Sequence, residues 1–396
     1  MAREVIQMRA RGFICVNAHP EGCRRNVAQQ IAAVNGHGRR EGAKNVLVVG
    51  ASAGYGLGSR IAAAWGFGAK TLGVFFERAP DGKKTGTAGW YNTSAFHDEA
   101  NKAGLYAASI NGDAFSDDVK RQAIEAIRRD MAPVDLVIYS LAAPKRTHPR
   151  TGEVHNSVLK PIGAPYTNKT IELDSGKVTE VTIPPATEKE IADTVAVMGG
   201  DDWRMWIDLL LAENLLAPGA RTLAYSYIGP ELTWAVYRDG TIGRAKLDLD
   251  ATARALDALL RTKRGGHAAI SVNKAVVTQA SAAIPVVPLY MSILFRVLRA
   301  KGLDESPVEQ MRRLFFDHLA AGQFPTFDAE GRIRMDDREM QPEIQQEVAR
   351  IWPQVTTENL RQLTDFAGFQ RGFRNLFGFE VEGVNYTEPV ETEASW

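Results

Sequence analysis

A short apolar run that ends in a glycine-rich turn is the feature that most limits how this chain can fold. Asn45-Val46-Leu47-Val48-Val49-Gly50 predicts a buried strand, because three valines and a leucine suit a strand that is covered on both faces. A small-residue helix is expected at residues 58–65 and a second strand at 71–77. A strand, a turn, a helix and a second strand together predict a βαβ unit.

Strand-like and helix-like segments continue to alternate beyond this unit. Further strands are expected at residues 105–110, 135–140, 222–228, 268–272 and 379–384, and helices at 116–131, 203–213 and 245–262. Such alternation predicts an α/β fold with a doubly wound, mostly parallel Rossmann-type sheet. An N-terminal extension precedes this sheet, and the part beyond Met291 is expected to be largely helical.

The alternation is interrupted between residues 145 and 191. Prolines and basic side chains mark a long connection there, and residues 171–183 predict a small hairpin around Ser175-Gly176. A chain of 396 residues can form one large domain with an extensive core. We therefore interpret residues 1–396 as a single domain, residues 45–145 as the first half of its dinucleotide-binding core, and residues 145–191 as an inserted connection.

Residues 275–295 form a stretch without formal charge that is as long as a membrane span. Polar side chains and helix-breaking prolines interrupt it at Thr278, Gln279, Ser281, Pro285 and Pro288. We therefore expect no membrane span here, but a loop and a helix that line a pocket.

The charge balance and the cysteine count exclude several classes of protein. The chain has 47 basic and 47 acidic residues, so no net field would attract nucleic acid or an anionic membrane. Cys15 and Cys23 are its two cysteines, which fits a reducing compartment, and residues 1–9 lack the apolar core of a secretory signal. We expect a cytoplasmic protein. The seven histidines form no closely spaced pair, so no metal site is predicted.

Three glycines mark a candidate dinucleotide site. Gly50, Gly54 and Gly56 lie where the first strand turns into the helix, so bare backbone can approach a pyrophosphate that faces the free helix N–H groups. The spacing is Gly-x-x-x-Gly-x-Gly, and no Gly-Lys-Ser/Thr follows, which excludes a P-loop. The alternative is a purely structural turn.

Polar residues at the ends of later strands extend this candidate site. Glu77 closes the second strand, where a carboxylate can bind an adenosine ribose and repel a 2′-phosphate, which favours NADH. Arg78 beside it would instead favour the phosphate of NADPH. Asp113-Ala114 lies beyond the third strand, near the expected adenine, and Ser140-Leu141-Ala142 ends the fourth.

Tyr237 is the one tyrosine of ten with a lysine nine residues downstream, Lys246, and no tyrosine has a lysine at plus four or plus seven. On one helix, nine residues advance about 900°, so the two side chains would point to opposite faces. Gly240 and Gly243 lie between them and suit a loop that returns the tyrosine to the lysine at the start of the next helix.

These two residue types suit the reduction of a conjugated thioester. Hydride delivery to the β-carbon leaves negative charge on the carbonyl oxygen, which a neutral phenol can stabilise or protonate. A nearby ammonium lowers the tyrosine pKa and can hold the cofactor ribose. Tyr227 shares a strand face with Tyr225 and is a candidate contact for the substrate carbonyl. The alternative for Tyr227 is a core aromatic with a satisfied hydroxyl.

Together these motifs resemble the FabV-type trans-2-enoyl-ACP/CoA reductases, long relatives of the short-chain dehydrogenases. The resemblance covers essentially the whole chain. It is carried by the Gly50-to-Gly56 turn, the Tyr237/Lys246 pair, and the segments Arg11-Gly12-Phe13-Ile14, Ala18-His19-Pro20-Glu21-Gly22-Cys23 and Val277-Thr278-Gln279-Ala280-Ser281.

The resemblance implies an NADH-dependent enzyme of fatty acid synthesis whose substrate is an enoyl thioester on acyl carrier protein or coenzyme A. It implies that Tyr237 is the proton donor and that Tyr227 contacts the substrate. It also implies a monomer with a substrate lid in the stretch 275–295. By resemblance the cofactor contacts are Gly50, Ala51, Ser52, Ala53, Gly54, Tyr55, Phe76, Glu77, Asp113, Ala114, Leu141, Ala142, Lys246, Val276, Val277 and Thr278.

Two other functions remain open at this point. A 3-ketoacyl reductase of the same superfamily would share the cofactor fold, although the chain has no Tyr-x-x-x-Lys. A dinucleotide-binding regulator would bind NADH without turnover if Tyr237 and Lys246 were incidental. Arg261, Lys263 and Arg264 are candidate docking residues for an acidic acyl carrier protein, or else an ordinary solvated helix end.

Overall fold

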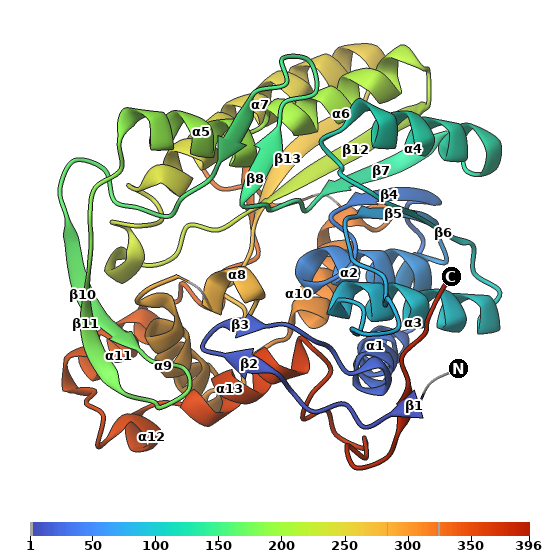
Figure 1. The fold of residues 1–396 in the computed structure, drawn as a ribbon. Helices are drawn as coiled ribbons and strands as arrows, with labels where there is room; N and C mark the ends of the chain where they lie inside the picture. Colours follow the sequence, from blue (N-terminus) through green and yellow to red (C-terminus); the bar gives the residue numbers. More distant parts are fainter. Residues whose placement is uncertain (1–2, 283, 324) are drawn as a thin grey trace.

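A seven-stranded parallel sheet organises the structure (Figure 1). This computed structural model describes residues 3–282, 284–323 and 325–396. In spatial order the strands are β14 (Arg332–Arg334), β13 (His267–Val272), β12 (Leu216–Ser226), β7 (Val134–Tyr139), β4 (Asn45–Val49), β5 (Lys70–Phe75) and β6 (Ala107–Asn111). The predicted doubly wound α/β fold is confirmed.

The order of the strands reverses between β4 and β7. From β4 the chain steps outward through β5 and β6, and it then returns to the other side of β4 with β7, β12, β13 and β14. In sheets of this kind, ligands bind beyond the carboxyl ends of the strands, at the point where the order reverses. The loops that follow Val49 and Tyr139 therefore mark the place where a ligand is expected.

Alternate side chains of the central strand point into two different cores. Val46 and Val48 pack into one apolar cluster, and Leu47 and Val49 pack into another. The helices of the first cluster are α1 (Pro20–Asn35), α2 (Gly54–Ile61), α3 (Ala88–Lys102) and α10 (Pro307–Arg313). Those of the second are α4 (Asp117–Asp130), α6 (Asp201–Ala212) and α7 (Thr241–Arg264). Helices thus cover both faces of the sheet, as Figure 1 shows.

Local residue choices explain where these helices begin and end. The Ser116 side chain accepts a hydrogen bond from the Val119 N–H and caps α4, close to the predicted boundary. Gly265, with a φ of 63°, ends α7. α2 begins at Gly54, earlier than predicted, and continues as a π-helix over Ala62–Phe67. The glycine turn therefore forms the first turn of the helix itself.

Two antiparallel hairpins occupy the connection between residues 145 and 191. β8 (Lys145–Thr147) pairs with β9 (Val154–Asn156), and β10 (Tyr166–Ile171) pairs with β11 (Val178–Ile183). The second hairpin is the one predicted around Ser175-Gly176, where Gly176 adopts a φ of 72° in the turn. α5 (Glu188–Met198) then packs on α7.

A third apolar core lies among the helices of the C-terminal part. It contains buried side chains of α9 (Val287–Ala300), α11 (Pro342–Ile351), α12 (Leu360–Leu363) and α13 (Phe366–Asn375). The uncharged stretch 275–295 contains a loop, the short α8 (Gln279–Ala282) and the first part of α9. Residue 283 lies outside the described residues. In the part of the chain that the structure describes, no helix is long and apolar enough to cross a membrane.

The strand predicted at residues 379–384 is wrong. The last strand of the sheet is β14, and β15 (Val390–Glu391) instead pairs with β1 (Arg3–Glu4). Gly378 and Glu380 both have positive φ, which bends the chain. The Tyr386 hydroxyl accepts a 2.7 Å hydrogen bond from the Val381 N–H and donates one of 3.0 Å to the Gly378 carbonyl. Local hydrogen bonds therefore take the place of a strand ladder.

Candidate active site

Each of the three positions in the turn favours glycine for a different structural reason. A Cβ on Gly50 would lie 2.3 Å from the Ser140 carbonyl oxygen, and one on Gly56 would lie 1.8 Å from that of Gly50, so both allow close backbone packing. Gly54 has a φ of 53°, and a Cβ there would meet only Thr278 Cγ2, at 4.0 Å. Gly54 therefore borders open space at the N-terminus of α2, where N–H groups suit a pyrophosphate.

Glu77 lies directly beside the glycine turn. It follows the end of β5 rather than closing the strand, and its carboxylate accepts a 2.6 Å hydrogen bond from the Ser52 hydroxyl. The neighbouring Phe76 ring is 78% exposed and is free to contact a bound molecule. The Arg78 guanidinium donates to the Thr85 carbonyl at 3.3 Å. A carboxylate in this position suits ribose hydroxyls and repels a 2′-phosphate.

A buried ion pair fixes the loop after β6. Lys120 Nζ donates to the carbonyls of Ala114 and Phe115, both at 2.9 Å, and to Asp202 Oδ1 at 2.7 Å. The ammonium therefore holds the segment that contains the predicted adenine contacts, Asp113-Ala114. The predicted Leu141-Ala142 segment follows β7 and adjoins the glycine turn, because a Cβ on Gly50 would lie 3.1 Å from the Leu141 nitrogen.

The loop after β13 closes the other side of this space. Tyr55, in the first turn of α2, donates a 2.6 Å hydrogen bond to the Lys274 carbonyl. Beyond it, the N–H of Thr278 donates to the Ser281 hydroxyl at 2.8 Å, and the N–H of Ser281 donates to the Thr278 hydroxyl at 3.0 Å. Of the predicted contacts at residues 276–278, Thr278 lies near the glycine turn, because a Cβ on Gly54 would lie 4.0 Å from its Cγ2, whereas the Val277 side chain lies beside Gly372 of α13. Together, the loops after β4, β5, β6, β7 and β13 fit a dinucleotide.

Tyr237 and Lys246 lie on separate elements, as predicted. Tyr237 follows a short 3-10 helix, and Lys246 lies in α7. Gly243, predicted to lie in the loop, is in the first turn of α7 instead, and a Cβ there would lie 1.9 Å from the Arg238 carbonyl oxygen, so the preceding turn can pack against the helix only at a glycine. Lys246 Nζ donates to the Tyr225 carbonyl at 3.2 Å. Burial lowers the pKa of Lys246 to about 8.

The phenol of Tyr237 is held in its protonated form. Its pKa is raised, first by burial and then by the negative charge of Glu339. The Lys246 ammonium, which is expected to lower this pKa, is not among the causes of the shift, and burial and the carboxylate set its direction. Within the described residues no hydrogen bond engages the Tyr237 hydroxyl, so its proton is available to a substrate oxygen.

Tyr227 lies against Tyr237 but directs its hydroxyl elsewhere. The two rings meet edge-on, with centroids 4.8 Å apart. The Tyr227 hydroxyl donates to Glu339 Oε1 at 2.9 Å, and the Tyr290 hydroxyl donates to the same oxygen at 2.6 Å. Sequence patterns do not single out Glu339, because its charged neighbours Asp336, Asp337 and Arg338 suggest a solvated surface. Tyr290 lies in the uncharged stretch that was expected to line a pocket.

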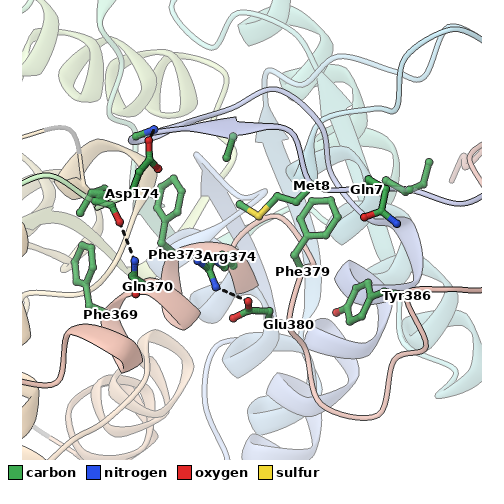
Figure 2. A pocket seen from close by; sticks show the side chains of 14 residues that line it. Gln7, Met8, Asp174, Phe369, Gln370, Phe373, Arg374, Phe379, Glu380 and Tyr386 are labelled. Atoms are coloured by element: carbon green, nitrogen blue, oxygen red, sulfur yellow. Dashed lines mark hydrogen bonds and ion pairs between the residues drawn. The ribbon is translucent and has the colours of Figure 1, made fainter. Parts of the chain in front are cut away.

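A surface pocket lies apart from these residues (Figure 2). It is lined by the N-terminal segment that includes β2 (Ala10–Arg11), by the turn at Asp174 and by α13. Figure 2 shows Arg374 of α13 paired with Glu380 at this pocket. None of the predicted cofactor or substrate contacts lines it, so we do not assign the chemistry to this pocket.

The basic residues considered as a carrier-protein dock lie at the wrong edge of the sheet. Arg261, Lys263 and Arg264 occupy the last turn of α7, just before β13 begins. Because the sheet is parallel, its carboxyl edge, with the glycine turn, lies on the opposite side. Arg261 also pairs with Asp257 at 2.7 Å. This cluster is therefore poorly placed to deliver an acyl chain to Tyr237.

Three family models match consecutive parts of the chain. The NAD(P)H binding domain of trans-2-enoyl-CoA reductase matches residues 5–82, the trans-2-enoyl-CoA reductase catalytic region matches 84–320, and an enoyl reductase FAD binding domain matches 327–390. The first region supplies β4 and β5 to the sheet, the second supplies β6, β7, β12 and β13, and the third supplies β14. One sheet therefore joins all three regions.

The residues of the third region do not fit a flavin dinucleotide. Such cofactors place their pyrophosphate at a glycine turn after a parallel strand. The loop after β14 reads Met335-Asp336-Asp337-Arg338-Glu339, which has no glycine and three carboxyl groups that would repel phosphate. The helices that follow bury their apolar faces in the third core. We therefore assign no chemical step to a flavin.

Similar proteins are all described as enoyl reductases. A protein of Opitutus terrae named enoyl-acyl-carrier-protein reductase (NADH) is 58% identical over 388 residues, which cover 98% of each chain. The crystal structure of Treponema denticola trans-2-enoyl-CoA reductase in complex with NAD is 46% identical, with a TM-score of 0.94 over 99% of this chain and 100% of that one. The corresponding Clostridium acetobutulicum structure, with NADH, is 40% identical, with a TM-score of 0.95 over 98% of each chain. The resemblance seen in the motifs is thus confirmed, and the chain belongs to the trans-2-enoyl-CoA reductase family.

Proposed function

We propose that this chain reduces the trans-2 double bond of enoyl thioesters with hydride from NADH, in fatty acid synthesis. The observation that carries the proposal is the Tyr237 phenol, which is protonated and has no hydrogen-bond partner among the described residues. The open space at Gly54 and the carboxylate of Glu77 support NADH as the cofactor. Membership of the family supports the enoyl thioester as the substrate.

The proposed reaction needs one hydride and one proton. When bound, NADH supplies the hydride that adds to the β-carbon. The α,β double bond breaks as this bond forms, and its electrons move onto the thioester carbonyl oxygen. Tyr237 donates a hydrogen bond or its proton to that oxygen. The carbonyl then re-forms as the α-carbon gains a proton from solvent. If Tyr237 has transferred its proton, the oxygen returns that proton to the phenolate as the carbonyl re-forms, so the net gain is one hydride and one proton and the phenol is unchanged after turnover.

Lys246 acts beside this phenol in the proposed mechanism. Its pKa of about 8 leaves the ammonium largely charged at neutral pH. The hydrogen bond to the Tyr225 carbonyl places the Lys246 ammonium at the carboxyl end of β12, and Tyr227 directly follows this strand. We assign it to the cofactor ribose and to stabilisation of the developing negative charge.

The substrate pocket is proposed to lie under the stretch 275–295. Tyr290 of α9 shares the Glu339 carboxylate with Tyr227, which links this stretch to the candidate substrate contact. The names of the relatives include both coenzyme A and acyl carrier protein, and the enoyl thioester is the unit common to both. We also propose that the protein is active as a monomer, as the family resemblance implies.

Purified protein should oxidise NADH when crotonyl-CoA is present and not otherwise. Acetoacetyl-CoA in place of crotonyl-CoA tests the alternative 3-ketoacyl reductase, and it should give no comparable rate. Tight NADH binding without turnover on any enoyl thioester would instead favour a regulator. Size-exclusion chromatography of the active protein checks the monomer.

A further inference from the structure

We propose that Glu339 is a positioning residue of the enoyl reduction: it holds the hydroxyl protons of Tyr227 and Tyr290, so that Tyr237 alone offers a proton to the substrate oxygen. This inference rests on the proposed function, and it assigns the carboxylate from a region whose family description is a flavin domain. It also separates the roles of two tyrosines that pack against each other.

Both carboxylate oxygens of Glu339 accept hydrogen bonds. The side chain is completely buried, with 0% exposure. Oε1 accepts from the Tyr227 hydroxyl at 2.9 Å and from the Tyr290 hydroxyl at 2.6 Å, and Oε2 accepts from the Ala275 N–H at 2.6 Å. Three donors from three separate segments therefore converge on one side chain, which suits its ionised form.

The surroundings of this carboxylate are mainly phenols and one ammonium. Burial raises the pKa of Glu339, and the hydrogen bonds from Tyr290 and Ala275 and the charge of Lys274 act against that rise. The groups around the carboxylate are Tyr227 after β12, Lys274 and Ala275 after β13, and Tyr290 on α9. Gln345 on α11 donates to the Glu339 backbone carbonyl. The negative charge of Glu339 also raises the pKa of Tyr55 and of Tyr237.

A phenol has one proton to donate, and this limits what Tyr227 can do. Because Tyr227 donates its proton to Glu339, it has none for the thioester carbonyl. The Tyr237 hydroxyl has no such partner among the described residues. The negative charge of Glu339 also raises the pKa of Tyr237, which keeps that phenol protonated before the hydride arrives.

Glu339 also connects the substrate side to the cofactor side. Its bond to the Ala275 N–H fixes the start of the loop that carries residues 276–278, the predicted nicotinamide contacts. Tyr55 holds the preceding carbonyl, that of Lys274, from the glycine turn. One carboxylate therefore sets the position of this loop and the direction of two phenol protons.

Glu339→Gln is the variant that tests this role. The amide keeps the size of the side chain but places a donor where an acceptor is needed, so either Ala275 or the two phenols lose their partner. We expect kcat/KM with crotonyl-CoA to fall about tenfold to a hundredfold, as for a lost hydrogen bond to a charged group. Above the change that Lys246 causes near pH 8, the alkaline limb that follows ionisation of Tyr237 should move to lower pH, because the negative charge of Glu339 no longer raises the pKa of this phenol.

Glu305→Gln is the matched control. Glu305 is another buried carboxylate of the C-terminal half, with 6% exposure, but it accepts from Arg313 and Gln310 and from none of the phenols. This variant should lower the melting temperature without moving the pH profile. An equal shift of the alkaline limb in both variants would overturn the assignment, as would a folded Glu339→Gln protein with the wild-type rate and pH profile.

Tyr227→Phe provides an independent test if Glu339→Gln does not fold. If Tyr227 gives its proton to Glu339, removing its hydroxyl should reduce kcat much less than Tyr237→Phe does. Equal losses of kcat in the two variants would overturn the inference. Failure of the wild-type protein to oxidise NADH with any enoyl thioester is a different outcome, which would refute the proposed function itself.

Discussion

The cofactor side and the substrate side of the site are built in different ways. The cofactor side consists of backbone turns at the ends of parallel strands, where Gly54 leaves open space and Glu77 lies beside the turn. The substrate side consists of buried side chains from distant segments, and Tyr227 and Glu339 are 112 residues apart in the chain. The cofactor side therefore depends on local backbone conformation, and the substrate side depends on long-range hydrogen bonds. Changes on the two sides should therefore affect different kinetic constants.

The largest effect is expected on the substrate side, from Tyr237→Phe. Loss of the proton donor should lower kcat on the order of 10²- to 10⁴-fold, the range typical of general acid catalysis, while NADH still binds. Steady-state rates with crotonyl-CoA and fluorescence titration of NADH measure the two constants. Tyr106→Phe is the control, because its hydroxyl contacts Asp130 beyond the amino end of β6. An accompanying loss of NADH affinity in Tyr237→Phe would show that the cofactor side and the substrate side do not act separately.

The next largest effect is expected on the cofactor side, from Gly54→Ala. The added Cβ enters the open space at the turn, so the Kd of NADH should rise about tenfold, equivalent to about 1.4 kcal/mol. Gly104→Ala is a matched control, since Gly104 also has a positive φ, of 65°, and open surroundings. Both variants should lose about 1–2 kcal/mol of stability from the strained backbone. Equal NADH affinities in the two variants would show that Gly54 does not border the cofactor.

A smaller effect is expected from the charge of Lys246. The ammonium is charged below its pKa of about 8 and neutral above it, so NADH binding should weaken several-fold as the pH rises through about 8. Titrations of NADH across this range test the prediction. Lys246→Arg keeps its charge at these pH values and should remove the dependence. A wild-type Kd that is constant through this range would mean that Lys246 does not hold the cofactor.

The smallest effect is expected from Glu77→Gln. The carboxylate is partly solvated, so losing its repulsion of a 2′-phosphate should reduce the preference for NADH over NADPH about two- to fivefold. The ratio of the two kcat/KM values measures this preference. The effect should shrink as salt is added, because screening weakens exposed charges. An unchanged ratio would assign cofactor selection to other residues.

Much of the cofactor side could be predicted from the sequence because its determinants are local. Gly50, Gly54 and Glu77 lie within one βαβ unit, and the apolar run of β4 makes that unit recognisable. The strand order then brings the later loops to the same edge, as the fold class implies. The turn between Tyr237 and Lys246 could be predicted for the same reason, because helix geometry and two nearby glycines require it.

The substrate side could be predicted only in part, because its partners meet through tertiary contacts. Glu339 follows β14, a strand of three residues that is too short for a period-two pattern to reveal. The pKa of Tyr237 was expected to follow Lys246, yet burial and Glu339 raise it. The strand expected at residues 379–384 fails similarly, because the Tyr386 hydroxyl satisfies backbone groups that a strand would pair.

The position of deuterium in the product tests the central claim most directly. Crotonyl-CoA reduced with NADH that is deuterated at the transferring carbon should give butyryl-CoA labelled at the β-carbon. The same reaction with ordinary NADH in deuterated water should give label at the α-carbon. Mass spectrometry or NMR of the product distinguishes the two positions. Cofactor-derived deuterium at the α-carbon, or a reduced product that contains no deuterium from the cofactor, would contradict hydride transfer from NADH to the β-carbon in this site.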